Sequence, residues 1–367
     1  MPYTLLKKDD TTAARLGRLR TAHYDIETPI FMPVGTQGTV KSLAPCELRD
    51  LGAQIILGNT YHLNLRPGMD IMAGAGGLHA FMGWDRAILT DSGGYQVFSL
   101  SKLRKLTPEG VHFQSHIDGS PLFLGPREAM AIQRTIGSDI AMVFDECTPY
   151  PCTHEEAAKS LALTLDWARR CKDQPRADGQ LVFGIVQGGM YEDLRRESLA
   201  ALVDIGFDGY AVGGLSVGEP EDNMFRVLDA IADTMPAAAP RYLMGVGTPP
   251  QIVEAVARGI DMFDCVLPTR QARHGTAYTA DGPIPVKAGR YKADFTPIEE
   301  GCACYTCRTF TKAYLRHLLN VNELLGHRLM TVHNTHFYLN LTRQIRTHIA
   351  AGSFGAFRSA FITRYHG

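Results

Sequence analysis

Short apolar runs recur along the chain, and each one stops abruptly at a carboxylate, an amide or a glycine pair. The eight runs are Pro29–Val34, Ile55–Leu57, Ala87–Leu89, Ile140–Phe144, Leu181–Val186, Tyr210–Val212, Tyr242–Val246 and Met262–Leu267. Helical patterns lie between most of them, at Arg127–Ile136, Glu155–Cys171, Leu194–Ile205 and Pro250–Ala257. Buried parallel strands read as short continuous apolar runs, and the helices between them indicate β/α units. Eight such units predict an α/β fold that closes into a (β/α)8 TIM barrel.

A single barrel with additions agrees with the length of the chain. The 367 residues are 45% hydrophobic, and one barrel takes about 250 residues. We therefore expect one barrel domain over residues 1–367. A Rossmann-like open sheet is the main alternative, but no Gly-x-Gly-x-x-Gly turn follows an early strand to support it.

The polar residues that follow the apolar runs are the candidates for a site, because the chemistry of such barrels lies at the carboxyl ends of the strands. One connection, at residues 102–121, is longer than a usual loop between strand and helix. We expect this segment to form a hairpin beside the barrel mouth.

Features of secretion and membrane insertion are missing from the sequence. Residues 1–20 carry charges throughout and contain no apolar h-region, so they do not resemble a signal peptide. No apolar stretch approaches the roughly 18 residues that a membrane span requires. Eight cysteines in such a chain favour metal binding or free thiols over disulfides. The expected location is the cytoplasm.

The near-neutral net charge of −1 hides an asymmetry along the chain. Residues 267–367 contain 13 Lys or Arg and 5 Asp or Glu, whereas the first 266 residues contain 24 and 33. A basic segment on an otherwise acidic protein is typical of a surface that binds a polyanion. A solvated helical surface would give the same balance, so charge alone does not decide between them.

The most specific local motif is Cys302-x-Cys304-x2-Cys307, with His333 further along the chain. Three thiolates and one imidazole fill the tetrahedral shell of a structural zinc ion and leave no position for substrate. The metal would then stabilise a segment too small for its own core, and we place this zinc-binding subdomain at residues 285–345. The sequence offers other histidines near His333 as the fourth ligand, namely His317, His327 and His336.

Three carboxylates at strand ends are candidates for catalysis. Asp91 opens the segment Asp-Ser-Gly-Gly-Tyr-Gln, Asp145 closes an apolar strand, and Asp264 lies inside the apolar segment 262–267. A charge within an apolar strand is costly unless it is paired or used. Each residue alone could be a structural hydrogen-bond acceptor. Together at one barrel mouth they indicate paired-carboxylate chemistry at a sugar carbon, in which one acid attacks and the other handles protons.

Neighbouring residues suggest what such a site would bind. Just past Asp264, three side chains suit backbone phosphates: Arg270, Arg273 and His274. Gln187 and the amides of Gly213–Gly214 suit the edge of a base. Tyr95 and Met244 offer apolar faces for stacking on it, although a methionine at such a position is more often part of the core.

Five ungapped motifs resemble the tRNA-guanine transglycosylase family, the queuine tRNA-ribosyltransferases of bacteria. The motifs are Asp91-Ser-Gly-Gly-Tyr-Gln-Val-Phe, Phe144-Asp-Glu-Cys-Thr-Pro-Tyr-Pro151, Gly184-Ile-Val-Gln-Gly-Gly189, Tyr210-Ala-Val-Gly-Gly-Leu215 and Phe263-Asp-Cys-Val-Leu-Pro-Thr-Arg270. The resemblance covers nearly the whole chain and includes the Cys302, Cys304, Cys307 and His333 zinc set. It implies a (β/α)8 barrel with a zinc subdomain that exchanges a base within tRNA without breaking the strand.

The resemblance also implies roles for the candidate residues. Asp264 matches the nucleophile that attacks the anomeric carbon of the ribose to give a covalent intermediate, and Asp91 matches the acid that handles protons. The base would be held by Asp145, Gln187, Gly214 and the carbonyl of Leu215, between Tyr95 and Met244. Without the resemblance, the sequence does not say which of Asp91 and Asp264 attacks.

The implied substrate is the wobble guanine of tRNAs with a U-G-U anticodon context, which is exchanged for a 7-deazaguanine. Val217 and Cys147 follow the bacterial pattern, whose pocket takes the small aminomethyl precursor of queuosine. The eukaryotic catalytic subunit has a smaller residue at the valine position, where it makes room for queuine. Valine here therefore argues against queuine as the incoming base.

The resemblance further implies a homodimer, in which one subunit catalyses while the other helps to hold the tRNA. Phe310, Tyr314 and His317 are spaced i, i+4 and i+7, so we expect them on one face of a helix beside the zinc set. Tryptophan is the familiar residue at the first of these positions, and Phe310 departs from it. The alternative is that this face packs on the barrel of its own chain.

Two other functions fit parts of the sequence. A non-catalytic, RNA-binding paralogue would keep the fold and the zinc, but loss of a catalytic acid would mark it, and Asp91 and Asp264 are both present. A barrel glycosidase acting on free nucleosides or sugars would explain the carboxylates. It would explain neither the basic C-terminal residues nor the zinc segment.

Overall fold

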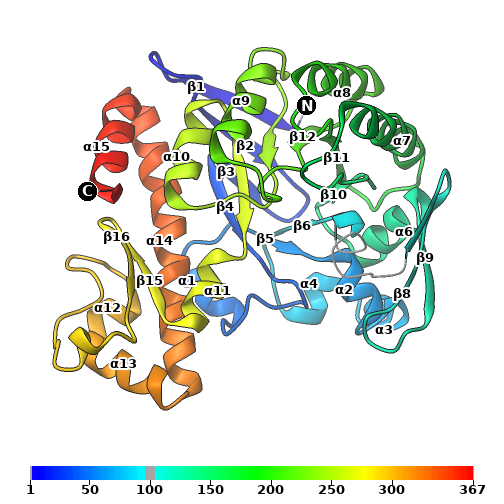
Figure 1. The fold of residues 1–367 in the computed structure, drawn as a ribbon. Helices are drawn as coiled ribbons and strands as arrows, with labels where there is room; N and C mark the ends of the chain where they lie inside the picture. Colours follow the sequence, from blue (N-terminus) through cyan, green and yellow to red (C-terminus); the bar gives the residue numbers. More distant parts are fainter. Residues whose placement is uncertain (1, 96–103, 367) are drawn as a thin grey trace.

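The computed structural model describes residues 2–95 and 104–366. Eight parallel strands form one sheet, in the order β4-β14-β13-β12-β11-β10-β6-β5. They are β4 (Ile30–Pro33), β5 (Ile55–Gly58), β6 (Ala87–Thr90), β10 (Ile140–Met142), β11 (Leu181–Val186), β12 (Gly209–Val212), β13 (Arg241–Leu243) and β14 (Met262–Cys265). A parallel bridge between Val34 and Leu57 joins the two edges of this sheet. The predicted (β/α)8 barrel is confirmed (Figure 1), and the alternative of an open sheet is excluded.

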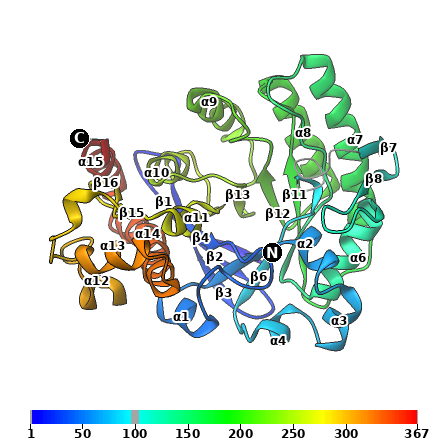
Figure 2. The same cartoon turned by 60° about the horizontal axis from the view of Figure 1, so that its bottom comes forward.

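Helices surround the barrel on its outer side (Figures 1 and 2). The four helical patterns of the sequence correspond to α6 (Pro126–Ile136), α7 (His154–Lys172), α8 (Glu192–Ile205) and α10 (Pro249–Ala257). Other helices around the barrel, within the described residues, are α1 (Pro45–Asp50), α2 (Thr60–Leu65), α3 (Met69–Gly74), α4 (Leu78–Met82) and α9 (Glu221–Ile231). Thr153 and Thr248 begin α7 and α10, and each side chain accepts a hydrogen bond from the backbone in the first helical turn. These caps satisfy N–H groups that have no partner within the helix.

The long connection after β6 forms an antiparallel sheet of three strands. They are β7 (Arg104–Thr107), β8 (Gly110–Gln114) and β9 (Pro121–Leu124). The predicted hairpin is thus confirmed from Arg104 onward, with β9 as an additional strand, whereas Lys102 and Leu103 lie outside the described residues. His116, in the turn between β8 and β9, lies 2.7 Å from the hydroxyl of Tyr61 on α2. This contact attaches the sheet to the helix that follows β5.

An antiparallel sheet of three strands precedes the barrel. This sheet is not predicted from the sequence. It consists of β1 (Tyr3–Lys8), β2 (Arg15–Arg20) and β3 (Asp25–Thr28), drawn in blue in Figure 1. Arg15 forms a buried ion pair with Asp261, directly before β14. The sheet therefore lies against the amino-terminal ends of the barrel strands, opposite the end at which such barrels do chemistry.

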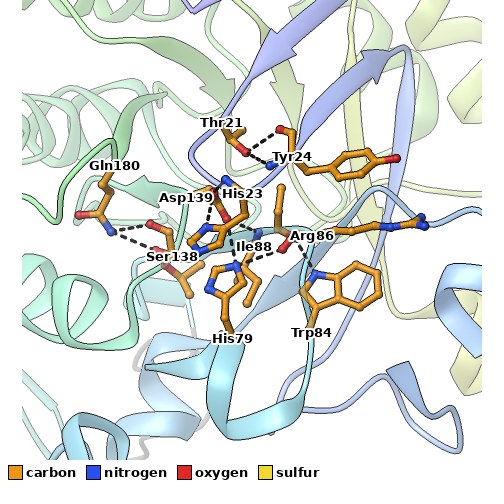
Figure 3. Close-up of polar contacts among 12 residues, drawn as sticks. Thr21, His23, Tyr24, His79, Trp84, Arg86, Ile88, Ser138, Asp139 and Gln180 are labelled. Atoms are coloured by element: carbon orange, nitrogen blue, oxygen red, sulfur yellow. Dashed lines mark hydrogen bonds and ion pairs between the residues drawn. The ribbon is translucent and has the colours of Figure 1, made fainter. Parts of the chain in front are cut away.

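Asp139, directly before β10, is a second anchor of this sheet (Figure 3). Its Oδ1 atom accepts bonds from the backbone N–H and the ring Nδ1 of His23, each at 2.9 Å. Its Oδ2 atom lies 2.8 Å from the N–H of Ile88 and 3.2 Å from Nε2 of His79. The same Nε2 atom faces the carbonyl oxygen of Arg86 at 3.0 Å, so it carries a proton and is not a free metal ligand. We therefore interpret this cluster as a structural anchor.

Asp139→Asn is expected to destabilise the protein by about 2 kcal/mol or more at pH 7, because an amide cannot accept all four bonds. Burial raises the pKa of Asp139, but hydrogen bonds from His79, Ile88 and His23 outweigh it and lower that pKa below its usual range. The stabilisation from a carboxylate with a depressed pKa is complete above its unfolded-state pKa and is lost as the pH falls through the folded-state value. Urea denaturation of both proteins should therefore show a gap at pH 7 that narrows below about pH 4.

Asp85→Asn is the control for this variant, because Asp85 is an exposed carboxylate paired with Arg49 near the same end of the barrel. We expect no measurable change in its urea midpoint. If Asp139→Asn kept the wild-type midpoint at pH 7, the anchor role of Asp139 would be wrong.

The C-terminal part adds a small sheet and several helices beside the barrel. They are α11 (Leu267–His274), β15 (Thr276–Thr279), β16 (Gly282–Pro285), η1 (Gly289–Tyr291), α12 (Tyr305–Thr309), α13 (Lys312–Asn320), α14 (Leu324–Ala351) and α15 (Phe354–His366). A second, smaller cluster of buried residues fills this region, including Ile298, Leu315 and Met330. The long α14 contacts both this region and β4 of the barrel (Figure 1). The subdomain limits 285–345 stay a prediction. Within the described residues, no helix is long and apolar enough to cross a membrane.

The predicted helix face of Phe310, Tyr314 and His317 is wrong in one respect. Phe310 lies outside α13 in an extended conformation, because the chain restarts a helix at Thr311, whose side chain accepts the N–H of Tyr314. The ring of Phe310 nevertheless stacks on Tyr314, with 5.4 Å between centroids, and meets the edge of Tyr305. Tyr305 and Tyr314 are 53% and 40% exposed. These two tyrosines therefore face solvent rather than the core of their own chain.

Candidate active site

The candidate residues gather at the carboxyl ends of the barrel strands. Asp91 follows β6, Asp145 follows β10, Gln187 follows β11, and Asp264 lies within β14. Parallel strands in a closed barrel present all their carboxyl ends at one face. Residues that are 173 positions apart in the sequence therefore meet at one mouth.

Asp264 is held by two donors. Its Oδ1 atom accepts a hydrogen bond from the Tyr242 hydroxyl at 2.6 Å and another from the Gly245 N–H at 2.7 Å. Burial raises the pKa of Asp264 above its usual value, while these two bonds act in the opposite direction. Burial and the charge of Asp264 raise the pKa of Tyr242 well above its usual range, so the tyrosine stays protonated and donates. The carboxylate of Asp264 is thus oriented at the mouth through its Oδ1 atom, and no bond to its Oδ2 atom comes from another described residue.

Asp91 is oriented from the neighbouring strand end. The Asn59 side-chain amide donates to its Oδ2 atom, and the Thr60 N–H donates to its Oδ1 atom at 3.0 Å. Asn59 also begins α2, because its own Oδ1 accepts the N–H of His62 at 3.0 Å. The sequence does not predict that Asn59 orients Asp91, because this contact joins the ends of two different strands. Tyr242 was counted among apolar residues and was missed as the donor to Asp264.

Asp145 and Gln187 form a polar pair across the ends of two strands. Oδ2 of Asp145 accepts from Nε2 of Gln187 at 2.7 Å, and its Oδ1 accepts from the Ser92 hydroxyl at 3.1 Å. Burial raises the pKa of Asp145 to about 6, despite the bonds from Gln187 and Ser92. The Asp145 carboxylate can accept hydrogen bonds, and the Gln187 amide can both donate and accept them. Together they are complementary to a base edge that carries donors and acceptors.

Gly213 and Gly214 let the backbone approach Gln187 closely. A Cβ atom on Gly213 would lie 2.8 Å from Nε2 of Gln187, and one on Gly214 would lie 2.4 Å from its Oε1. Gly214 also has a φ of +64°, in the left-handed region that favours glycine. A side chain at either position would therefore collide with Gln187.

The other predicted contacts lie around this pair. Leu215 and Cys147 are buried, and burial raises the pKa of the Cys147 thiol to about 12, so the thiol is neutral at pH 7. The Val217 N–H is held by the carboxylate of Glu219 at 2.9 Å. A Cβ on Gly213 would lie 3.5 Å from the Met244 sulfur, so Met244 borders the glycine pair. Tyr95 is 50% exposed just after the Gly93–Gly94 turn.

The three basic residues continue from Asp264 along α11. Arg270 and His274 are exposed, and Arg273 is half-buried with Nη1 donating to the carbonyl of Thr269 at 2.9 Å. The helix begins at Leu267, three positions after Asp264. Positive charge therefore flanks the side of the mouth on which Asp264 lies.

Cys302, Cys304, Cys307 and His333 form a cluster in which all four ligand atoms lie within 4.8 Å of one another. The three sulfur atoms lie 3.9, 3.6 and 3.3 Å from Nδ1 of His333. These separations fit a tetrahedral site with Zn–S bonds of about 2.3 Å and a Zn–N bond of about 2.0 Å. Nε2 of His333 faces the carbonyl of Tyr278 at 2.7 Å, which leaves Nδ1 free as the ligand. The cluster can hold a metal ion with no open position.

Of the other histidines considered, His336 approaches the cluster, with Nδ1 3.6 Å from the sulfur of Cys302. It comes one helical turn after His333 on α14. A single turn of α14 therefore places one imidazole as a ligand and the other beside a ligand.

Asn334 connects the metal cluster to the mouth. Its side-chain amide donates to the carbonyls of Pro268, in the first turn of α11, and Thr276, each at 3.0 Å. Its Oδ1 accepts from the N–H of Tyr278 at 3.0 Å. The cluster thus supports the helix that carries the basic residues.

Fold and site together define the class of the protein: a (β/α)8-barrel enzyme with several carboxylates at its mouth and a metal-binding cluster in its C-terminal part. Comparison with known proteins makes the assignment specific. The sequence profile of the family described as queuine tRNA-ribosyltransferase matches residues 9–367. The chain belongs to this family, whose members are tRNA-guanine transglycosylases, a kind of pentosyltransferase.

Curated relatives agree over nearly the full length of the chain. A queuine tRNA-ribosyltransferase from Aromatoleum aromaticum is 59% identical over 351 residues, covering 95% of each chain. Relatives of the same name from Symbiobacterium thermophilum and Francisella tularensis subsp. novicida are each 56% identical over 365 residues. The first match covers 99% of this chain and 91% of the relative, and the second covers 100% and 99%. The family resemblance of the sequence motifs is confirmed.

Proposed function

We propose that the protein exchanges the wobble guanine of tRNAs for Asp, Asn, His and Tyr, within the U-G-U anticodon context, for 7-aminomethyl-7-deazaguanine. The observation that carries this proposal is the pairing of a donor-supported carboxylate, Asp264, with the Asp145–Gln187 pair at the same mouth. The first suits attack on a ribose carbon. The second suits the Watson–Crick edge of a guanine.

Asp264 would attack C1′ of the ribose, so that the bond from C1′ to N9 of guanine breaks and a C1′–Oδ bond forms. Asp91 would protonate the departing guanine and then deprotonate the incoming base at N9. That nitrogen attacks C1′ and releases Asp264. Two displacements on one carbon return the original configuration, as in retaining glycosidases. Asn59 and Thr60 orient Asp91 for this role.

The base would lie against the Asp145–Gln187 pair and the N–H of Gly214, between Tyr95 and Met244. The carboxylate of Asp145 would accept the N1 and N2 hydrogens of guanine, and the amides would donate to O6. The carbonyl of Leu215 would accept from the aminomethyl group. Val217 and Cys147 would limit the space beyond that group and so disfavour queuine.

The anticodon loop would lie across α11, where Arg270, Arg273 and His274 would contact backbone phosphates. Moving the target guanine out of its stack costs a few kcal/mol, which favours an unpaired loop base. The zinc ion that we assign to Cys302, Cys304, Cys307 and His333 would be structural. The exposed Tyr305 and Tyr314 beside Phe310 support a homodimer through this face, and a tRNA substrate implies a cytoplasmic protein.

Following labelled guanine into a short anticodon hairpin tests the proposal. We expect incorporation into a U-G-U hairpin and none into a U-A-U hairpin of the same stem. A folded, metal-loaded protein that incorporates no guanine would overturn the proposal. If that inactive protein still bound the hairpin, the function of a non-catalytic RNA-binding paralogue would be favoured instead. Exchange on free guanosine, with no preference for the hairpin, would instead support the glycosidase alternative.

Base recognition should depend on pH through Asp145. The proposed contact needs the ionised carboxylate, and burial raises the pKa of Asp145 to about 6. The KM for guanine is therefore expected to be constant from pH 8 to about 6.5 and to rise up to about tenfold per pH unit below pH 6. Steady-state guanine exchange between pH 5 and 8 measures this.

Glu146→Gln is the matched variant, because the charge of Glu146 contributes to the raised pKa of Asp145. Its removal should move the inflection to lower pH while leaving the KM at pH 8 unchanged. A wild-type KM for guanine that did not vary between pH 5 and 8 would contradict the role given to Asp145.

A further inference from the structure

Arg195, in the first turns of α8, is fully buried beside the candidate base site. Its Nη1 atom donates to the carbonyls of Val186 at 2.7 Å and Gly213 at 2.8 Å. Its Nε atom donates to the carbonyl of Gly189 at 2.8 Å. Val186 ends β11 and Gly213 follows β12, so one guanidinium ties together two neighbouring strand ends.

These strand ends carry two of the residues that would read the base. Gln187 comes directly after Val186, and Gly214 comes directly after Gly213. The α8 helix holds Gln187 a second time, because the hydroxyl of Ser198, three positions after Arg195, accepts the N–H of Gln187 at 3.1 Å. The relative position of Gln187 and Gly214 therefore depends on contacts from the first turns of one helix.

The charge of Arg195 is buried without a carboxylate partner among the described residues. None of the ion pairs among the described residues involves Arg195, and its bonds go to backbone carbonyls instead. Its Nη2 atom is buried and has no hydrogen-bond partner within residues 2–95 and 104–366. A Cβ on Gly214 would lie 3.5 Å from this atom, so the free donor faces the base-reading loop. Burial lowers the pKa of Arg195 to about 10, which leaves it charged at neutral pH.

A buried donor without a partner and a buried charge without a carboxylate are both costly. The contacts of Arg195 are not needed to join β11 to β12, because the carbonyl of Val186 already accepts the N–H of Gly213 in the sheet. A binding site whose loop must stay in one position is a functional reason to keep this buried guanidinium.

We propose that Arg195 is a positioning residue for base recognition, which fixes Gln187 and Gly214 at the spacing that the guanine edge requires. This inference rests on the proposed function. Arg195 reaches three carbonyls through a rigid planar fork, which a lysine ammonium on a flexible stem cannot reproduce. Loss of the fork should therefore loosen base binding and leave the reacting carboxylates in place.

Arg195→Lys is expected to raise the KM for guanine about 10- to 100-fold while kcat stays within about threefold of wild type. Ser198→Ala removes the weaker support of Gln187 and should raise the same KM by about threefold. Labelled-guanine exchange at saturating U-G-U hairpin measures both constants, and thermal melting checks the fold of each variant.

Arg241→Lys is the matched control. Arg241 is also a buried arginine that donates to a carbonyl, that of Met235, and it lies at the opposite end of the neighbouring strand β13. It should lower thermal stability with a KM for guanine within about twofold of wild type. A general structural role for Arg195 would give the two variants the same kinetic profile.

Different outcomes separate the inference from the function on which it rests. No guanine exchange by the wild type would overturn the proposed function. An active wild type with Arg195→Lys unchanged in KM, or reduced only in kcat, would overturn the role of Arg195 alone. Should Arg195→Lys fail to fold, Ser198→Ala decides: an unchanged KM in that variant contradicts the inference.

Discussion

Asp264→Asn is expected to lower the rate of guanine exchange by at least about 10⁴-fold, because an amide oxygen is far too weak a nucleophile to attack the ribose. The substitution conserves size, and the new amide oxygen can still accept from the Tyr242 hydroxyl and the Gly245 N–H. The fold and the affinity for the hairpin should therefore survive. Initial rates of labelled-guanine incorporation, with thermal melting as the check of folding, measure the effect.

Tyr242→Phe is the graded companion of this variant, because it removes one donor to Asp264 and leaves the carboxylate. We expect a loss in kcat of about tenfold, the size typical of one hydrogen bond to a charged group. A folded Asp264→Asn protein with more than about a tenth of wild-type activity would exclude Asp264 as nucleophile.

Removal of the zinc ion proposed for Cys302, Cys304, Cys307 and His333 is expected to have the largest effect on stability. Structural zinc contributes about 10–16 kcal/mol of binding free energy in small zinc domains, and the region around Cys302–Cys307 has only a small buried core of its own. Chelation, or Cys307→Ala, should lower the melting temperature by at least about 10 °C and release one zinc ion per chain. Thermal melting and a metal assay on the denatured protein measure both quantities.

The effect should extend to the mouth, since Asn334 joins α14 to the first turn of α11. Hairpin affinity of the metal-free protein should therefore fall along with stability. Cys46→Ala is the control, because Cys46 is an exposed thiol outside the cluster. A metal-free protein that melted at the wild-type temperature would contradict a structural metal at these four residues.

The barrel and its mouth could be predicted because both depend on local signals. A strand buried on both faces must be a continuous apolar run, and a polar residue at its end stands out against that run. Asp91 and Asp145 are such residues, whereas Asp264 is recognisable as a charge inside an apolar run. That they share one mouth followed from the predicted closure of eight parallel strands.

Parts of the structure that depend on contacts between distant segments could not be predicted. The sequence of the N-terminal sheet looks like a charged segment, because its strands alternate polar and apolar residues. The contacts that hold this sheet come from Asp139 and Asp261, which lie far along the chain. Arg195 looks like any polar residue in a helical pattern until the fold brings three carbonyls around it.

Phe310 shows a third limit of the sequence. Its spacing to Tyr314 and His317 suits one helix. In the structure, however, α12 ends at Thr309, and a new helix begins at Lys312 because the Thr311 side chain caps it. A threonine before a helical pattern is a known start signal. The i, i+4, i+7 spacing of the three residues nevertheless favours a single helix, so the two signals in the sequence disagree.

The most direct measurement of the central claim is the covalent intermediate itself. Wild-type protein, mixed with end-labelled U-G-U hairpin and rapidly freed of the released guanine, should give a protein–RNA band on a denaturing gel. Excess guanine should discharge that band and return intact hairpin, and Asp264→Asn should give no band. A wild type that exchanges guanine without forming a guanine-dischargeable band, or an Asp264→Asn protein that forms one, would contradict double displacement through Asp264.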